Sequence, residues 1–162
     1  RGLRVAGDHV FVDKLRWNFR PPKRGQITVF DTDDIATLPP QTHYIKRMVA
    51  LPGESVSIDP PRLLINGKRV NTHETMRKIM NETHPYKGYK LVPIGHGANQ
   101  QDWQMRTTND VLRLAMDQYF TLGDNTSNSK DGRYWGTVPQ KNLVGPAVLI
   151  YWPFSERWGL TR

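Results

Sequence analysis

The sequence predicts a mainly β protein of antiparallel sheets, or a partial barrel, with a small irregular or helical insertion. Three observations support this fold class: short segments alternate between polar and apolar residues, proline-rich or glycine-rich turns separate them, and little of the chain has helical periodicity. The expected strands lie at 8–13, 26–30, 43–51, 55–58, 63–65, 68–70, 119–122 and 143–152. The 162 residues suffice for one domain with a buried core, or for a core that carries an insertion.

The turns between these segments predict how neighbouring strands are joined. Residues 20–25, Arg-Pro-Pro-Lys-Arg-Gly, predict a loop, because proline restricts φ and glycine readily closes a turn. Asp59-Pro60-Pro61 lies between two short apolar segments and predicts a hairpin. Asn66-Gly67 predicts a second, tighter hairpin, because both residue types tolerate the positive φ of a two-residue turn.

The composition changes after Val70, where the alternation ends and the chain becomes polar. A short helix is expected over 75–82, and a second one from the capping pair Asn109-Asp110 to Met116. The sequence therefore predicts a β core formed by 1–70 and 117–162, with 71–116 as an insertion subdomain.

The net charge of +8 allows three interpretations: an ordinary solvated surface, attraction to anionic lipid headgroups, or nucleic-acid binding. Nucleic acid is the least favoured, because the basic residues are scattered rather than gathered in a stripe. The absence of cysteine excludes disulfides, thiol catalysis and cysteine-based zinc sites. No apolar run approaches the ~18 residues of a membrane span, and we expect any such span to precede Arg1.

Lys46 lies in an alternating segment that ends at the turn Pro52-Gly53. A lysine can act as a general base only when neutral, and burial can lower its pKa by up to about 3–5 units from about 10.4. The alternation places Lys46 on the same strand face as Met48. Lys46 is therefore either a partly buried amine on that face or an ordinary solvated lysine of a strand.

The segment from Gly123 to Arg133 is a second polar cluster, with the sequence GDNTSNSKDGR. Asp and Asn side chains bond readily to nearby backbone, so the composition predicts a rigid, self-bonded loop. This loop is either a turn alone or a source of a hydroxyl group that orients Lys46. An ion pair between Asp131 and Arg133 is expected to hold its shape. The spacing lacks the closing glutamate of a calcium loop, and no metal site is expected.

Four segments, in this order, resemble the boxes of type I signal peptidases, which are serine–lysine peptidases. They are Gly7–Lys14, Pro22–Phe30, Tyr44–Glu54 and Tyr119–Gly145. The middle of the chain has no such match. The signal is specific because Tyr-Ile-Lys-Arg and Gly-Asp-Asn…Ser-x-Asp-x-Arg-Tyr-Trp-Gly occur together.

The resemblance implies a β peptidase that needs no metal or organic cofactor. Such an enzyme is a signal peptidase I, which removes signal peptides from exported preproteins after small residues. It is anchored in the cell membrane with its active site on the extracytoplasmic side. The implied partners are preprotein signal peptides and the lipid surface rather than nucleic acid, and a monomer is expected.

The same resemblance assigns roles to residues of the matching boxes. Lys46 would be the general base, and Ser129 would hydrogen-bond to it and orient it. The loop would be supported by Asp124, Asp131 and Arg133, and the substrate groove would be lined by Tyr44 and Ile45.

The chain departs from the family pattern in two places. The last box usually has an Arg-Asp pair where this chain has Thr126-Ser127, and a serine where it has Gly132. The nucleophile box, Ser-Met-x-Pro-Thr-Leu, precedes the Gly-Asp strand, whereas residues 1–6 contain no serine. We therefore expect the nucleophilic serine upstream of residue 1, and we expect these 162 residues alone not to hydrolyse peptides.

Aromatic residues near arginines suggest either a patch at the bilayer interface or ordinary core packing. They are Trp17, Phe19, Trp152, Phe154 and Trp158, near Arg16, Arg20, Arg157 and Arg162.

Two other functions remain open. One is a self-cleaving serine–lysine peptidase of the repressor type, which requires a DNA-binding helix pair upstream. The other is a non-enzymatic basic β-barrel that binds nucleic acid or peptide. The latter would tolerate Lys46→Met and would bind with a steep salt dependence.

Overall fold

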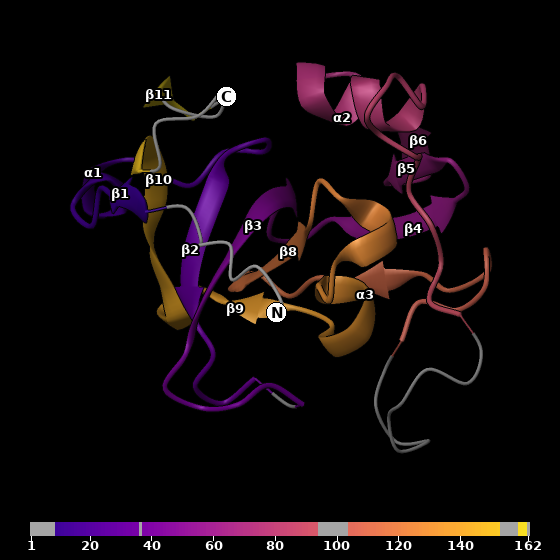
Figure 1. The fold of residues 1–162 in the computed structure, drawn as a ribbon. Coiled ribbons are helices and arrows are strands. Elements are labelled where there is room, and N and C mark those ends of the chain that lie inside the picture. The colour runs from indigo at the N-terminus through magenta and orange to yellow at the C-terminus, as the bar shows by residue number, and fades with distance from the viewer. Residues whose placement is uncertain (1–8, 36, 94–103, 153–158, 162) are drawn as a thin grey trace, which may run out of the picture.

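Two antiparallel sheets form the frame of the computed structural model, which describes residues 9–35, 37–93, 104–152 and 159–161 (Figure 1). The first sheet holds the candidate site. In spatial order its strands are β1 (His9–Val12), β10 (Leu143–Trp152), β2 (Ile27–Asp31), β3 (His43–Ala50), β8 (Gln118–Leu122) and β9 (Val138–Pro139), and β11 (Gly159–Leu160) pairs with β10. The expected mainly antiparallel β fold is confirmed.

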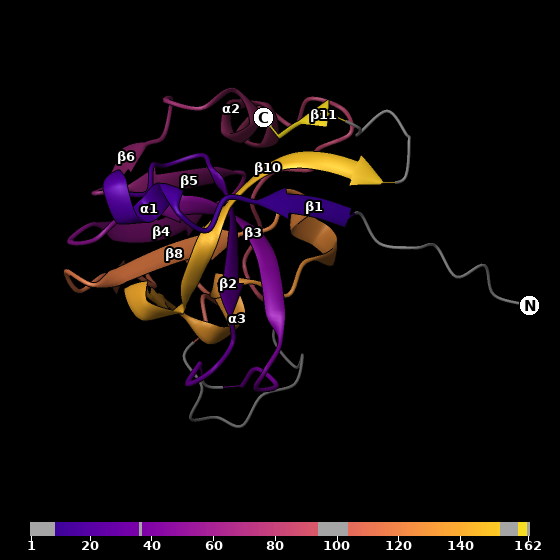
Figure 2. The ribbon, with the colours of Figure 1, turned by 90° about the vertical axis from the view of Figure 1, so that its left-hand side faces the viewer.

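Strand β10 bends between two partners, so the first sheet curls (Figure 2). Its first half lies against β2, with Leu143 opposite Phe30. Its second half lies against β1, with Leu149 opposite Phe11. The sheet thereby forms a curved surface on which β1, β10, β2 and β3 line a common concavity.

The second sheet consists of β6 (Lys68–Arg69), β5 (Arg62–Ile65), β4 (Ser55–Asp59) and β7 (Leu112–Arg113). Pro60-Pro61 links β4 to β5, with Asp59 opposite Arg62. Asn66 and Gly67, with φ angles of 51° and 72°, form the two-residue turn into β6. Both predicted hairpins are confirmed.

The helical segments are short: α1 (Arg16–Phe19), α2 (Glu74–Met80), α3 (Gly132–Trp135), and the 3₁₀ turns η1 (Thr126–Asn128) and η2 (Gln140–Asn142). The helix predicted over 75–82 is present as α2, which lies beside the second sheet (Figure 1). Within the described residues, no helix is long and apolar enough to cross a bilayer.

The helix predicted from Asn109 to Met116 is wrong. Leu112 pairs with Val56, and Leu114 is buried two residues further on. The segment therefore has a strand period of two, and ladder bonds to β4 outweigh the weak helical preference of so short a stretch.

The larger core lies between α2, the second sheet and the end of β3 and β8. Its members come from all of these elements, and include Val49, Ala50, Val56, Leu63, Met76, Ile79, Tyr89, Met105, Leu114 and Phe120. Phe30, Ile35, Leu38, Trp135 and Val138 form a second, smaller core. Residues of 71–116 thus share the larger core with the β strands, and the domain boundaries at 70 and 117 stay a prediction.

Candidate active site

Lys46 lies where strand β3 enters the protein. The preceding Ile45 is 44% exposed, whereas Arg47 is 4% exposed and the next three residues are completely buried. Neighbouring β2 covers one side of the strand, with Thr28 opposite Lys46. The aliphatic stem of Lys46 is therefore packed against protein, and its half-buried amine lies at the edge of the core.

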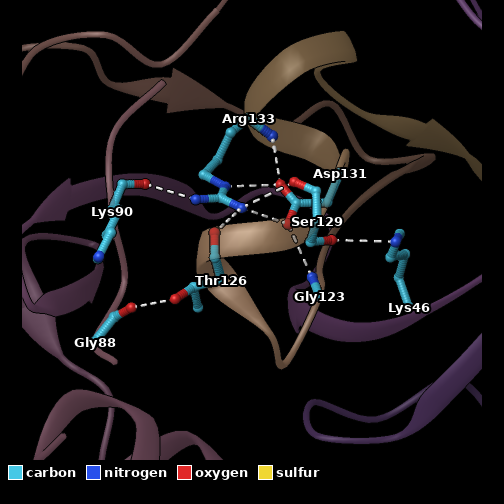
Figure 3. A network of polar contacts seen from close by, with 8 residues as sticks. All are labelled: Lys46, Gly88, Lys90, Gly123, Thr126, Ser129, Asp131 and Arg133. Carbon is cyan, nitrogen blue, oxygen red and sulfur yellow. Dashed lines mark hydrogen bonds and ion pairs between the residues drawn. The ribbon is translucent and has the colours of Figure 1, made fainter. Parts of the chain in front are cut away.

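The amine of Lys46 meets the hydroxyl of Ser129. Its Nζ donates a hydrogen bond to Ser129 Oγ at 3.1 Å, across a sequence separation of 83 residues (Figure 3). The sheet register explains the meeting: β8 is antiparallel to β3, with Leu122 opposite Arg47. The segment that follows β8 therefore begins beside Lys46. We call residues 123–131 the site loop.

The pKa of Lys46 lies below its ordinary value. Burial disfavours the charged ammonium and is the largest cause of the lowering. The carboxylates of Asp131 and Asp124 raise the pKa, whereas the Arg133 guanidinium lowers it. The ring of Tyr44, whose centroid is 5.9 Å from Nζ, offers only weak attraction to the cation. The environment as a whole therefore increases the fraction of neutral amine, the form that a general base needs.

A buried ion pair holds the site loop. Arg133 Nε donates to Asp131 Oδ1 at 2.8 Å and Arg133 Nη2 donates to Asp131 Oδ2 at 2.9 Å. Asp131 also accepts from the backbone N–H of Gly123 at 2.9 Å, which closes the loop from end to end. Arg133 donates further to the carbonyls of Thr126 and Ser129. The expected ion pair is present, and its other polar groups are satisfied, as burial of charge requires.

A second ion pair, which the sequence analysis did not single out, joins Arg47 to Asp124. The guanidinium of Arg47 makes two bonds to this carboxylate, of 2.8 and 2.7 Å, and a third to the carbonyl of Gly25. It fixes the start of the site loop to β3, one residue from Lys46. The sequence did contain a signal for this ion pair: Arg47 is followed by the apolar run Met48 to Leu51. A charged side chain that is buried in a core requires a partner.

Lys46 faces a groove of about 550 Å³ on the curved sheet. Tyr44 and Ile45 line it, together with Gly123 and Asp124, and their role in binding substrate stays a prediction. The remaining wall is largely apolar and is formed by Val10, Val12, Ile27, Val29, His43, Arg47, Ile150 and Thr161. The site thus combines an amine of lowered pKa, a hydroxyl that is hydrogen-bonded to it and a largely apolar groove beside them.

Residues 4–152 match the model of the family described as signal peptidase, peptidase S26. The chain belongs to this signal peptidase family. It is 32% identical over 154 residues to the signal peptidase I of Leptolyngbya laminosa, covering 93% of this chain and 63% of that protein. It is likewise 32% identical over 165 residues to the signal peptidase I of Rickettsia prowazekii, covering 93% and 60%. The chain thus spans about six-tenths of the length of these relatives.

A crystal structure of a signal peptidase I from Enterococcus faecalis V583 has a similar fold. The TM-score is 0.53 at 23% sequence identity, and the match covers 78% of this chain and 97% of that one. The likeness supports the arrangement of sheets as that of the signal peptidase family.

The seven residues assigned to the site from the sequence lie in one region of the structure. Lys46, Tyr44 and Ile45 come from β3, and the site loop with α3 supplies the others, Asp124, Ser129, Asp131 and Arg133. Ile45 differs from the rest, because its exposed side chain lines the groove without a polar contact. Among the aromatic residues, Trp17 is half-buried and Phe19 is 83% exposed. The side chain of Trp152, and all of Phe154, Arg157, Trp158 and Arg162, lie outside the described residues.

Gly123 leaves the space that Ser129 occupies. A Cβ on Gly123 would lie 2.0 Å from Ser129 Oγ and 2.5 Å from its Cβ. We therefore expect Gly123→Ala to displace Ser129 and to lengthen or break its bond to Lys46, which a crystal structure of the variant would show.

The matched control is the double variant Gly123→Ala/Ser129→Gly, compared with Ser129→Gly alone. Removing the serine side chain relieves the clash, so Gly123→Ala should cost far less folding stability in that background than in the parent. Equal costs in the two backgrounds would show that the clash is not what makes a glycine necessary.

Proposed function

We propose that this chain is the catalytic part of a signal peptidase I, a serine endopeptidase that removes signal peptides from exported preproteins. The observation that carries the proposal is the 3.1 Å bond between Lys46 Nζ and Ser129 Oγ beside an apolar groove. Membership of the signal peptidase family, and relatives named signal peptidase I, support the same activity.

In the proposed reaction a serine hydroxyl attacks the scissile carbonyl carbon. As the new C–O bond forms, the hydroxyl proton passes to neutral Lys46 Nζ. The C–N bond then breaks, and the leaving amine takes this proton from the ammonium. A water molecule attacks the resulting ester, again losing its proton to Lys46, and the serine oxygen regains a proton as the acid product leaves.

The residues of this chain prepare Lys46 for these proton transfers. Burial lowers the pKa of the amine and so raises its neutral fraction, and Ser129 Oγ accepts a hydrogen bond from one of its N–H groups. With that N–H engaged, rotation about the terminal C–N bond is restricted, and the lone pair is directed at a nearly constant angle. Tyr44 and Ile45 would contact the small and apolar residues of the signal peptide next to the scissile bond.

The proposed site of action is the extracytoplasmic surface of the cell membrane, with the protein as a monomer. Three exposed apolar side chains support contact with lipid: Phe11 is 62% exposed, Leu15 is 66% exposed and Phe19 is 83% exposed. The net charge of +8 favours anionic headgroups. Co-sedimentation with vesicles of anionic lipid tests this location, and binding that Phe19→Ser leaves unchanged would argue against it.

The pH dependence of cleavage tests the proposed chemistry. The full-length protein is expected to release the signal peptide of a purified preprotein, with the cut after a small residue identified by mass spectrometry. Because only the neutral amine accepts a proton, kcat/KM should rise with pH to a plateau. The midpoint of the rise should lie below about 10.4, the ordinary pKa of lysine, because burial lowers the pKa of Lys46.

The free energy of unfolding should also depend on the ionisation of Lys46. The folded state has the lower pKa, so between that pKa and about 10.4 the unfolded chain binds more protons. The free energy of unfolding should therefore rise with pH in this window, and Lys46→Met should remove that part of the rise.

The cleavage measurement has its own contradicting outcome. A kcat/KM that is independent of pH, or that falls through this range, would contradict the role of Lys46 as the base.

A further inference from the structure

We propose that Thr126 is a positioning residue: it ties the site loop to a strap formed by residues 86–92, and so keeps Ser129 within reach of Lys46. The inference rests on the proposed function, since it concerns the base of the same reaction. It lies outside the residues that the family resemblance assigns, because Thr126 stands where the family pattern has an arginine. The strap belongs to the part of the chain without a match to the family boxes.

The strap is anchored independently of the site loop. The N–H of Tyr89 donates to the carbonyl of Pro61 at 3.0 Å, and the N–H of Val92 donates to that of Met105 at 2.8 Å. Tyr89 is 1% exposed and belongs to the larger core, and Val92 is 2% exposed, so two buried side chains hold the segment in place. The strap is thereby fixed to the tip of the hairpin formed by β4 and β5.

Gly88 brings the strap backbone unusually close to this hairpin. Its φ of 70° is in the left-handed region, and a Cβ at this position would lie 2.5 Å from the Cβ of Pro61. The carbonyl of Gly88 faces the site loop instead (Figure 3). A fixed acceptor is therefore presented to whatever side chain the loop carries there.

Thr126 supplies the donor. Its hydroxyl donates to the carbonyl of Gly88, and the residue is only 5% exposed. Beside this bond, Arg133 Nη1 donates to the carbonyl of Lys90 at 2.9 Å, so the strap is bonded to the loop region at two points (Figure 3). Threonine suits the place because its short side chain lets the two backbones approach until one hydroxyl spans the gap.

The connection from Thr126 to Ser129 is short. One nitrogen of Arg133, Nη2, donates to the carbonyl of Thr126 at 2.9 Å and lies 3.2 Å from that of Ser129. Thr126 begins the 3₁₀ turn η1, which ends immediately before Ser129. If the Thr126 hydroxyl leaves the strap, the turn keeps only its bonds from Arg133, and Ser129 is held less firmly over the amine.

The pKa of Lys46 distinguishes positioning from simple stabilisation. The charged groups that act on this amine are Asp124 and Asp131 of the site loop and Arg133 of α3, and burial is the largest cause of the lowered pKa. A loosened loop admits water to the amine, which raises its pKa toward the ordinary value. A side chain that merely stabilised the fold would leave this pKa unchanged in the molecules that remain folded.

The experiment titrates Lys46 by NMR in this chain with ¹³C-labelled lysine. Thr126→Val, which keeps the shape and removes the hydroxyl, is expected to raise the Lys46 pKa by at least about one unit. Thr126→Ser, which keeps the hydroxyl, should titrate like the parent. In the full-length protein, Thr126→Val should lower kcat/KM near pH 7 about tenfold, because each unit of pKa reduces the neutral fraction by that factor.

Thr126→Ala is the second variant, in case the valine form does not fold, because it leaves room for a water to satisfy the Gly88 carbonyl. A parental Lys46 pKa in both Thr126→Val and Thr126→Ala would overturn the proposal, as would an equal shift in Thr126→Ser. The proposed function fails differently: the full-length protein would not cleave a preprotein, whether or not the Thr126 variants shift the Lys46 pKa.

Discussion

Lys46→Met is expected to lower kcat of the full-length protein by at least about 100-fold, the lower end of what a general base contributes. Methionine has nearly the length and apolar stem of lysine, and Lys46 is half-buried, so the variant should fold. Its Sδ cannot accept the proton of the nucleophile. Cleavage of a preprotein under single-turnover conditions measures the loss in the chemical step.

Lys130→Met is the matched control. Lys130 is adjacent to Ser129 in the same loop and is exposed, so the substitution removes the same charge without touching the groove. It should leave kcat within a factor of about two, since surface substitutions away from special features change little. A Lys46→Met protein that still cleaves at the parental rate would show that another group is the general base.

Asp131→Asn is expected to lower the free energy of unfolding of this chain by about 3–5 kcal/mol, which is typical when one partner of a buried ion pair is removed. The side chain of Asp131 is completely buried and that of Arg133 is 3% exposed, so water cannot replace the lost carboxylate. Urea unfolding followed by circular dichroism measures the change.

The control for this prediction is Asp34→Asn. Asp34 also forms an ion pair, with Lys141 at 2.7 Å, but both side chains are largely exposed. Solvent screens such a pair, so the urea midpoint should stay close to that of the parent. Similar midpoints for the Asp131 and Asp34 variants would show that burial of the Asp131–Arg133 pair does not set its importance.

The catalytic consequence of Asp131→Asn should be distinct from its effect on stability. The Asp131 carboxylate raises the pKa of Lys46, opposing the effect of burial. In folded molecules that keep the loop in place, its loss should therefore lower that pKa further. The ascending limb of the pH profile would then move to lower pH, even though the protein unfolds more easily.

Most strands could be predicted because their signals are local. The alternation at 43–51 and 55–58 reflects the period of a pleated strand, and Asn66-Gly67 satisfies a backbone requirement within the turn itself. Helix α2 was predictable for the same reason, since Met76, Ile79 and Met80 lie on one helical face. Strand β7 was not, because it forms two ladder pairs with distant β4.

The candidate site shows the same division. The sequence alone placed a lysine before a Pro-Gly turn and a hydroxyl-rich loop after a strand, and its resemblance to a known family linked the two. Alternation left Lys46 either buried or solvated, because a strand has two faces and the pattern does not say which one is covered. Burial of the amine, which lies beside β2 and bonds to Ser129 of the site loop, is what lowers its pKa.

Contacts between distant segments complete the site, and no local pattern encodes them. Arg47 and Asp124 are 77 residues apart, and Thr126 bonds to a carbonyl 38 residues away, in a segment that has no family motif. A hydrogen bond to a backbone carbonyl depends on where the accepting segment of the chain lies, and not on the side chains of that segment. Residue types and spacing therefore specify the chemistry that this protein has available, and the long-range packing of β3, the site loop and the strap sets the protonation and orientation that make it usable.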